Sequence, residues 1–235
     1  MHEHTPPSAS NESSDRGDVA RKSLLEAGLK IYSEVGYEKA STRQIAQEAG
    51  VNIAAIPYYF GSKEGLYFAV IDTIIDYYKS TLGVWMTQVH DALQAPDIDR
   101  TELSALLERF LRQVAHSVLE HNPKRDQISL IYSREQLDPT SAFNQLYKGF
   151  VCDFHETIAV VVARILGREQ VTSDIRIIAQ TLMGQITVFK SSRRAILLNM
   201  GWSQYDEANI AEIEQIVISQ ARAILQAHQH TSASL

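Results

Sequence analysis

Apolar residues recur at helical spacing along most of the chain, and no stretch alternates with the two-residue period of a β-strand. The first such stretch starts near Val19 and ends at Gly36. It places Leu24, Ile31 and Val35 on one helix face. Further helical stretches, separated by turn signals, cover residues 41–50, 52–60, 62–94, 103–121, 127–137, 140–166, 174–199 and 206–228. The pattern predicts an all-α fold of about nine or ten helices.

Residues 41–66 predict two short helices joined by a tight turn. Ser41 can cap the first helix with its side-chain oxygen. Gly50 can adopt the positive φ that ends a helix and turns the chain, and Asn52 can cap the second helix. With a helix before this pair and a fourth helix after it over residues 62–94, the layout is that of a helix-turn-helix domain that reads DNA.

Three small or aliphatic positions, Ala46, Gly50 and Ile56, are expected to fix how the two short helices cross. Side chains that point outward from the second helix can then enter a major groove about 12 Å wide. Hydroxyl, guanidinium and ammonium groups beside that helix suit phosphate contacts. The predicted DNA-binding residues are Thr42, Arg43, Asn52, Ala54, Ala55, Tyr58, Tyr59 and Lys63.

Pro57 falls inside the predicted second helix and lacks a backbone N–H. If this helix begins near Ile53, with Ile53 and Ile56 on its inner face, the proline removes about one intrahelical hydrogen bond, so we expect a short or bent helix. Ala54 and Ala55 offer only methyl groups, which suit thymine methyls. Base readout is therefore expected to be sparse, and sequence preference to depend partly on DNA shape.

Residues 19–68 resemble the DNA-binding domain of the TetR family of transcriptional regulators. The resemblance depends on the run Tyr58-Tyr59-Phe60 followed by Ser62-Lys63-Glu64 and Leu66. Two later runs, SREQLDPT at residues 133–140 and ILLNMGW at residues 196–202, further resemble the CecR-like (YbiH-like) subgroup. Pro57 departs from the family pattern, which often has tyrosine or threonine at that position.

The resemblance implies a ligand-responsive transcriptional regulator that is not an enzyme, and most often a repressor. Such a protein binds an inverted-repeat operator in double-stranded DNA as a homodimer and is released by a small-molecule effector. The subgroup is associated with control of transport and drug-sensitivity genes. The expected segments are a disordered tail (1–18), a helix-turn-helix DNA-binding domain (19–66) and a helical effector-binding and dimerisation domain (67–230), with the fourth helix joining the two domains.

Charge and composition refine this expectation. The 235-residue chain has a formal net charge of -6, but residues 19–63 carry six Lys and Arg against four Glu, a balance of +2. Non-specific DNA affinity is therefore expected to be modest, and specific binding to need two copies acting together. No apolar run reaches the ~20 residues of a membrane-spanning helix, and the polar N-terminus is unlike a secretory signal. We expect a cytoplasmic protein with no membrane partner.

Two helices near the C-terminus carry apolar stripes at helical spacing. Two such helices from each chain can close a four-helix dimer interface, or each stripe can pack inside one chain. A two-fold DNA element favours the dimer. The predicted dimer-interface residues are Ile186, Phe189, Arg193, Ile213, Val217 and Ile224.

Candidate effector-binding residues are polar groups inside otherwise apolar helices, together with aromatic and methionine side chains that suit an apolar ligand. Each has a structural alternative: Arg134 and Glu135 can form a helix-end ion pair, and Gln185 can bond across a dimer seam. The candidates are Phe110, Tyr132, Arg134, Gln136, His155, Met183, Gln185 and Phe189.

An enzyme is the main competing class, but the chain has no G-x-S-x-G, H-E-x-x-H or G-x-x-x-x-G-K motif. Cys152 lies three residues before His155, yet no third group or oxyanion donor is evident, so helix packing is the favoured interpretation. Histidine pairs near both termini lie in predicted tails, and we expect no metal and no cofactor. The remaining alternative is a helical protein-interaction module that has lost specific DNA binding, for which the proline and the acidic balance argue.

Overall fold

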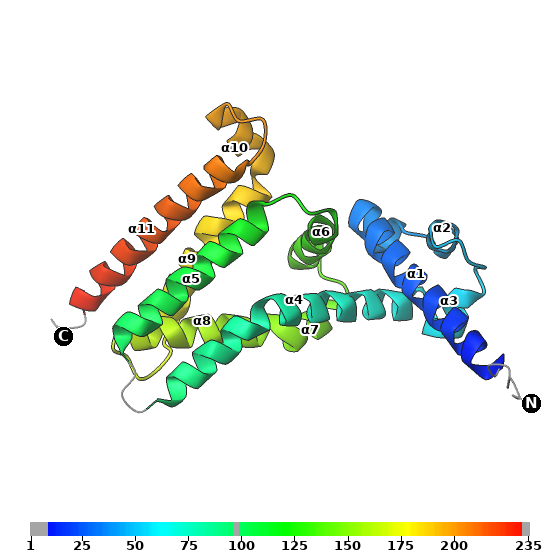
Figure 1. Cartoon of the computed structure of the whole chain (residues 1–235), viewed down its shortest axis with the longest axis horizontal. Coiled ribbons are helices and arrows are strands. Elements are labelled where there is room, and N and C mark those ends of the chain that lie inside the picture. The colour runs from blue at the N-terminus through cyan, green and yellow to red at the C-terminus, as the bar shows by residue number, and fades with distance from the viewer. Residues whose placement is uncertain (1–8, 96–98, 232–235) are drawn as a thin grey trace, which may run out of the picture. The chain divides into compact units, whose positions relative to one another are not determined.

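The computed structural model describes residues 9–95 and 99–231, and Figure 1 shows their elements. Every regular element in these ranges is a helix, which confirms the predicted all-α fold. The elements are α1 (Ala9–Lys39), α2 (Thr42–Glu48), α3 (Ala55–Phe60), α4 (Lys63–Gln94), α5 (Arg100–Leu119), α6 (Pro123–Leu137), α7 (Phe143–Leu146), the π-helix η1 (Tyr147–Val151), α8 (Cys152–Ile165), α9 (Ser173–Ser191), α10 (Arg193–Met200) and α11 (Glu207–Thr231). Within the described ranges, no helix is long and apolar enough to cross a membrane.

The chain folds as two compact units. Unit 1 comprises Met1–Tyr78 and Pro123–Gly149, and unit 2 comprises Lys79–Asn122 and Phe150–Leu235. Unit 1 therefore contains α1 to α3, the first half of α4, α6 and α7, whereas α5 and α8 to α11 belong to unit 2. The boundary predicted after residue 66 divides the DNA-binding domain from the effector-binding and dimerisation domain, and it stays a prediction.

The first helix is longer than expected. Residues 9–18, which were predicted to be disordered, form the first turns of α1, while residues 1–8 lie outside the described range. At its other end, α1 is broken at Gly36, whose φ of 80° is non-helical, before a last turn that ends at Lys39.

Unit 1 has a core of aliphatic and tyrosine side chains drawn from four helices. Leu24 and Tyr32 of α1, Ile45 of α2, Ile56 of α3 and Leu66 of α4 are each at most 1% exposed. Burying a side chain of this size contributes roughly 1.5–3 kcal/mol. The two short helices are thus anchored to α1 and α4 through one shared core.

Unit 2 is built around α5, which packs against α8, α9 and α11 (Figure 1). The Asp99 carboxylate caps α5 by accepting a hydrogen bond from the Thr101 N–H at 2.8 Å. Behind the apolar face of α5, Phe110 stacks on Trp85 with ring centroids 3.8 Å apart, and Phe154 lies 5.8 Å from Phe110. This aromatic group fills the centre of the unit.

The long helix predicted over residues 140–166 is divided into α7, η1 and α8. The expected kink near Gly149 takes the form of the π-helical turn. Inside unit 1, a Cβ added to Gly149 would lie 2.6 Å from the Cδ1 of Ile75, so the missing side chain lets this turn approach α4 closely.

Candidate DNA-binding site

The start and end of α2 follow from local sequence chemistry. The Ser41 Oγ accepts a hydrogen bond from the Gln44 N–H at 3.2 Å, and the Gln44 Oε1 accepts one from the Ser41 N–H at 3.1 Å. This reciprocal pair is a capping box, and it confirms the predicted cap. At the other end, Gly50 has a φ of 66°, and the Val51 N–H donates to the Ala46 carbonyl at 3.0 Å.

The second helix, α3, begins two residues later than expected. The Asn52 Oδ1 accepts a hydrogen bond from the Ala54 N–H at 2.8 Å, which forms a turn ahead of the helix. The prediction that Asn52 caps this helix is therefore wrong, because the N-cap residue is Ala54, which makes no side-chain capping bond. Ile53 therefore lies outside α3 and is 49% exposed, so its predicted place on the inner face is wrong, whereas Ile56 is 1% exposed. The extra turn before α3 rotates Ile53 toward solvent.

Pro57 occupies the third position of α3. The first N–H groups of any helix have no intrahelical acceptor, so a proline there removes little. The helix is short, as predicted, but its six residues end at the Gly61 turn, where the Gly61 N–H donates to the Pro57 carbonyl at 3.0 Å.

The turn that joins α3 to α4 leaves little space between their backbones. The Gly65 N–H donates to the Ser62 Oγ at 3.0 Å, which confirms Ser62 as the cap of the fourth helix. A Cβ added to Gly65 would lie 1.9 Å from the carbonyl oxygen of Phe60, the last residue of α3. Only glycine fits here without moving the backbone, so this contact ties the end of the reading helix to the start of α4.

The surface around α3 offers few side chains for base contact. Tyr58 is 81% exposed, and its ring meets the ring of Tyr59 edge-on at 4.8 Å. Asn52 and Ala54 are exposed, whereas Ala55 is half-buried. The structure therefore brings these predicted residues together on one short exposed segment, and their contact with DNA stays a prediction.

The residues predicted to contact phosphates differ in their exposure and in whether their side chains already have partners. Arg43 is exposed, and Thr42 is half-buried at the first position of α2. Lys63, by contrast, is held by its own unit: its Nζ lies 4.5 Å from the Tyr37 ring centroid and donates to the Glu38 carbonyl at 3.2 Å. The Lys63 ammonium therefore already has partners in unit 1, although a hydrogen bond to one carbonyl uses only one of its three N–H donors.

Two further candidates lie at this surface that were not predicted from the sequence. Ile53 is exposed beside Asn52 and can contact thymine methyl groups. The Arg21 guanidinium lies 5.4 Å from the Phe60 ring centroid, which places a cation from α1 beside the end of α3. The signal for Ile53 was its position immediately after a residue that favours turns, and no local pattern indicated Arg21.

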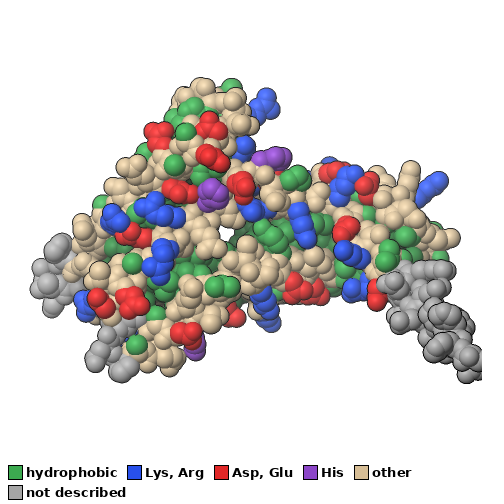
Figure 2. Space-filling model, viewed as in Figure 1, with side chains coloured by type: hydrophobic (Ala, Val, Ile, Leu, Met, Phe, Trp, Pro, Cys, Tyr) green, Lys and Arg blue, Asp and Glu red, His purple; other side chains and the backbone are tan. Residues whose placement is uncertain are grey.

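Acidic and basic side chains are interspersed on the face shown in Figure 2. One basic residue of unit 1, Lys30, is already paired with Glu48, with 2.7 Å between Nζ and Oε1. The expectation of modest non-specific affinity follows from this balance.

The residues predicted for a dimer interface lie mostly inside unit 2. Ile186, Ile213 and Val217 are each at most 4% exposed within the single chain. Arg193 donates to the Leu119 carbonyl at 3.3 Å, at the end of α5, and its guanidinium lies 4.5 Å from a tyrosine ring. Phe189 and Ile224 are half-buried. Ile186, Ile213 and Val217 thus pack within one chain, as the alternative interpretation held, whereas an interface role for Phe189, Arg193 and Ile224 stays a prediction.

The eight effector candidates are divided between the two units. Tyr132, Arg134 and Gln136 belong to unit 1, and the other five belong to unit 2. Phe110 is 1% exposed in the aromatic core, and Arg134 is hydrogen-bonded to α1 rather than to Glu135. The alternative of an ion pair with Glu135 is not what the structure shows, because the guanidinium donates to carbonyls of α1 instead.

The remaining candidates lie along α8 and α9. Burial lowers the pKa of His155, whose Nδ1 is 3.1 Å from the Gln180 Nε2. The Gln185 Oε1 is buried and has no hydrogen-bond partner among the described residues. Met183 is half-buried. An unpaired buried acceptor is costly, so Gln185 is the candidate with a specific reason to meet a ligand.

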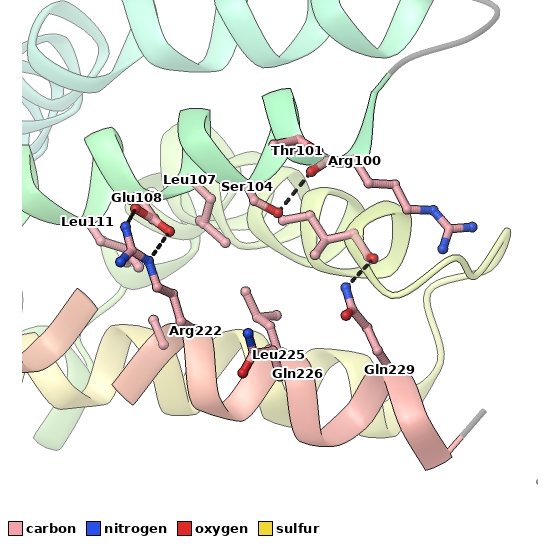
Figure 3. Close-up of a pocket in the computed structure, with 12 residues that line it drawn as sticks. Arg100, Thr101, Ser104, Leu107, Glu108, Leu111, Arg222, Leu225, Gln226 and Gln229 are labelled. Atoms are coloured by element: carbon pink, nitrogen blue, oxygen red, sulfur yellow. Dashed lines mark hydrogen bonds and ion pairs between the residues drawn. The ribbon is translucent and has the colours of Figure 1, made fainter. Parts of the chain in front are cut away.

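Unit 2 also contains a pocket of about 320 Å³ between α5 and α11 (Figure 3). Leu107 and Leu225 are part of its apolar lining, while Ser104 and Gln226 add polar groups. None of the eight effector candidates is among its described lining residues. The pocket has the size of a small ligand site.

Two families match this chain. Residues 24–70 match the family described as bacterial regulatory proteins, tetR family, and residues 103–228 match the C-terminal domain of the HTH-type transcriptional dual regulator CecR. The protein of that name from Shigella flexneri is 33% identical over 213 residues, which cover 90% of this chain and 93% of the relative. The HTH-type transcriptional regulator RutR from Escherichia coli (strain K12) is 40% identical over 62 residues, which cover 26% of this chain and 29% of that protein.

Solved structures share the fold at lower identity. A TetR transcription regulator from Haloarcula marismortui ATCC 43049 matches with a TM-score of 0.54 and 20% identity, over 88% of this chain and 97% of its own. HlyIIR, a hemolysin II transcriptional regulator, matches with a TM-score of 0.53 and 21% identity, over 85% of this chain and 97% of its own. At these identities the likeness concerns the fold alone.

Proposed function

The chain belongs to the TetR family of bacterial regulatory proteins and carries a CecR-type C-terminal domain, and we propose that it represses transcription as an effector-controlled homodimer on an inverted-repeat operator. The chain is a transcriptional regulator. The DNA site, the dimer, the effector and the direction of control are the proposed parts. Control of transport or drug-sensitivity genes is proposed from the subgroup resemblance.

The observation that carries the proposal is the exposed segment of α3. Two glycine turns and two side-chain caps hold a six-residue helix against α1 and α4, with Tyr58 81% exposed. A large aromatic side chain at this exposure has no role in the core of its own unit. It can stack on sugar or contact base edges, and its hydroxyl can donate to phosphate.

For the dimer we propose the exposed face of α9 and α11, not the buried stripes. On α9, Ile177 is 63% and Val188 is 43% exposed, and Gly184 lies on the same face between them. On α11, Ile216 is 50% exposed. Exposed apolar groups at helical spacing on α9, with one more on α11, suit a self-complementary interface between copies.

For the effector we propose a site within unit 2. The pocket between α5 and α11 has an apolar lining and polar groups, which suits a small molecule with both characters. Gln185 is a second candidate position, because a ligand donor would satisfy its buried oxygen. Thermal shift of the full chain with a panel of hydrophobic drugs and metabolites tests both, and loss of a shift in a Ser104→Leu or a Gln185→Leu variant assigns the site.

The experiment for the proposed function is DNA protection on fragments from the region upstream of its own gene. We expect protection of an inverted repeat by the wild-type protein and its loss in Tyr58→Ala. Tyr147→Ala is the matched control, because Tyr147 is also exposed, at 41%, but lies in η1. Arg43→Ala should weaken binding and reduce the dependence on salt by about one charge.

Two results would contradict parts of this proposal. Unchanged protection in Tyr58→Ala would remove the residue assignment. Absence of any protected fragment would favour the alternative, a helical interaction module. Because the relative from Shigella flexneri is named a dual regulator, transcript levels from the protected gene should be compared with and without the protein. A rise in transcripts on deletion supports repression, and a fall contradicts it.

A further inference from the structure

The run SREQLDPT contains two adjacent charged residues with separate partners, both inside unit 1. The Arg134 Nη2 donates to the Ser33 carbonyl at 3.3 Å and to the Glu34 carbonyl at 3.0 Å, 100 residues earlier in the chain. These carbonyls lie in the last turn of α1 before the break at Gly36. A helix interrupted there leaves carbonyls without intrahelical donors, and a cation is the favoured partner at a helix C-terminal end.

Gly36 makes room for this contact as well as for the break. A Cβ added to Gly36 would lie 3.2 Å from the Arg134 Nη1, closer than nearly all real contacts of this kind. The φ of 80° is also one that other residues rarely adopt. The break in α1 and the arginine of α6 therefore form one joint.

The neighbouring Glu135 points to a different helix. Its carboxylate is buried, with the residue 1% exposed, and accepts three hydrogen bonds. The Tyr67 hydroxyl donates to Oε1 at 2.6 Å, the Thr140 hydroxyl to Oε1 at 2.8 Å, and the Thr140 N–H to Oε2 at 3.1 Å. Burial, and then the bond to Glu135, raises the pKa of Tyr67 far above its usual range, so this hydroxyl remains a donor.

Tyr67 connects Glu135 to the residues that hold the start of α4. Its ring lies 4.8 Å from the rings of both Tyr32 and Tyr37. The Tyr32 hydroxyl donates to the Lys63 carbonyl at 3.2 Å, and the Lys63 Nζ lies over the Tyr37 ring. The start of α4 is thereby held by residues that contact α6.

Residues that follow α6 also contact the first turns of α4. The Ser141 hydroxyl donates to the Glu64 Oε1 at 2.9 Å, and the Gln145 Nε2 donates to the Phe68 carbonyl at 3.2 Å.

We propose that Arg134 and Glu135 are positioning residues that clamp α6 to the ends of α1 and α4 and so set the placement of the DNA-reading helix for two-headed binding. The proposal concerns regulation of the DNA site and depends on the proposed function. The segment Pro123–Gly149, which contains α6, is joined through the chain to unit 2 at both of its ends. A clamp on α6 therefore holds the N-terminal helices of unit 1 with a helix that is distant from them in sequence.

The two heads of a dimer must match half-sites about one helical turn apart, roughly 34–36 Å, so their placement matters to an inverted repeat but not to a single half-site. Arg134→Ala should lower affinity for the inverted repeat by about tenfold, within the usual range of coupling between sites. Affinity for a fragment with one half-site, measured at low salt, should stay within about twofold, since Arg134 is bonded to carbonyls of α1 and is not one of the proposed DNA contacts. The salt dependence per half-site should not change.

Three further variants complete the experiment. Arg134→Lys keeps a cation for the α1 carbonyls and should restore most of the affinity for the repeat. Glu135→Gln keeps the volume but offers one acceptor oxygen in place of two, so it cannot accept all three hydrogen bonds as the carboxylate does and should also lower the preference for the repeat. Leu137→Ala is the control on the same helix, because Leu137 is 86% exposed. Equal repeat and half-site losses, or no loss in Arg134→Ala and Glu135→Gln, would overturn the proposal.

Hydrogen exchange on the protein without DNA separates this proposal from the proposed function. Arg134→Ala should speed exchange of amides around the α1 break and the start of α4, with no change in α11. Unchanged exchange there would overturn the clamp even if the wild-type protein binds DNA. If the wild-type protein binds no fragment, the proposed function fails. Faster exchange in Arg134→Ala would then show that the two residues hold α6 against α1 and α4, but their proposed role in DNA binding would be overturned.

Discussion

Replacing Gly65 with alanine tests the close contact that ties α3 to α4. The added Cβ would lie 1.9 Å from the Phe60 carbonyl oxygen, about 1.5 Å closer than the 3.4 Å at which ordinary contact begins. Because the neighbour is backbone, rotation of a side chain cannot relieve the overlap. Overpacking usually costs about 1–3 kcal/mol, and a backbone clash belongs at the upper end, at about 3 kcal/mol.

The same helix provides a matched control. Gly83 also lies inside α4, but a Cβ there would meet nothing within 4 Å. Gly83→Ala should stabilise the protein by about 0.4–1 kcal/mol, because it reduces the freedom of the unfolded chain. For a chain of this size, 1 kcal/mol shifts Tm by roughly 2–4 °C. Gly65→Ala should therefore melt about 6–12 °C lower than the wild type and Gly83→Ala about 1–4 °C higher.

Thermal unfolding followed by circular dichroism measures both variants, and DNA protection at a temperature where both are folded gives the functional effect. Moving the Phe60 carbonyl displaces the end of the reading helix, so Gly65→Ala should also lose operator affinity while Gly83→Ala keeps it. Equal melting temperatures for the two variants would refute the close contact.

Two other predictions concern unit 2. Ile216→Glu should convert the dimer to a monomer in sedimentation, because it places a charge on the proposed interface, whereas the same change at exposed Ala211 should not; a dimer in both would contradict the proposed face. The hydrogen bond from Arg222 lowers the pKa of Glu108 from its ordinary value of 4.5, so the pair stabilises the fold above that value, and this stabilisation is lost as the pH falls through the lowered pKa. Glu108→Gln should therefore reduce the drop in Tm between about pH 7 and about pH 3, modestly because the pair is partly exposed, and an unchanged drop would contradict the linkage.

The helices and turns of residues 41–66 were largely predictable because the sequence signals that form them are local. The cap at Ser41, the turn at Gly50 and the cap at Ser62 each depend on residues within five positions of one another. The start of α3 was missed, because the turn made by Asn52 competes with the helix start and only the folded chain shows which prevails. That single turn decides whether Ile53 is buried or exposed.

The candidate sites outside residues 41–66 were less predictable because their partners are distant in sequence. Arg134 and Glu135 look like a local ion pair, and nothing in the sequence around them indicates carbonyls of α1 or the hydroxyl of Tyr67. Likewise, a stripe such as Ile213 and Val217 has the same period whether it faces a second chain or its own. Only the packing of α5 against α11 decides that these residues belong to the core.

The most direct test of the central claim compares the Kd of the wild-type protein for the inverted repeat with its Kd for the same fragment with both half-sites scrambled, at one salt concentration. A specific regulator is expected to prefer its site by about a thousandfold or more, and the sparse reading surface places this protein near that lower limit. A preference of about a thousandfold that falls sharply in Tyr58→Ala is the predicted result. Equal Kd values for the two fragments would contradict sequence-specific DNA binding by α3.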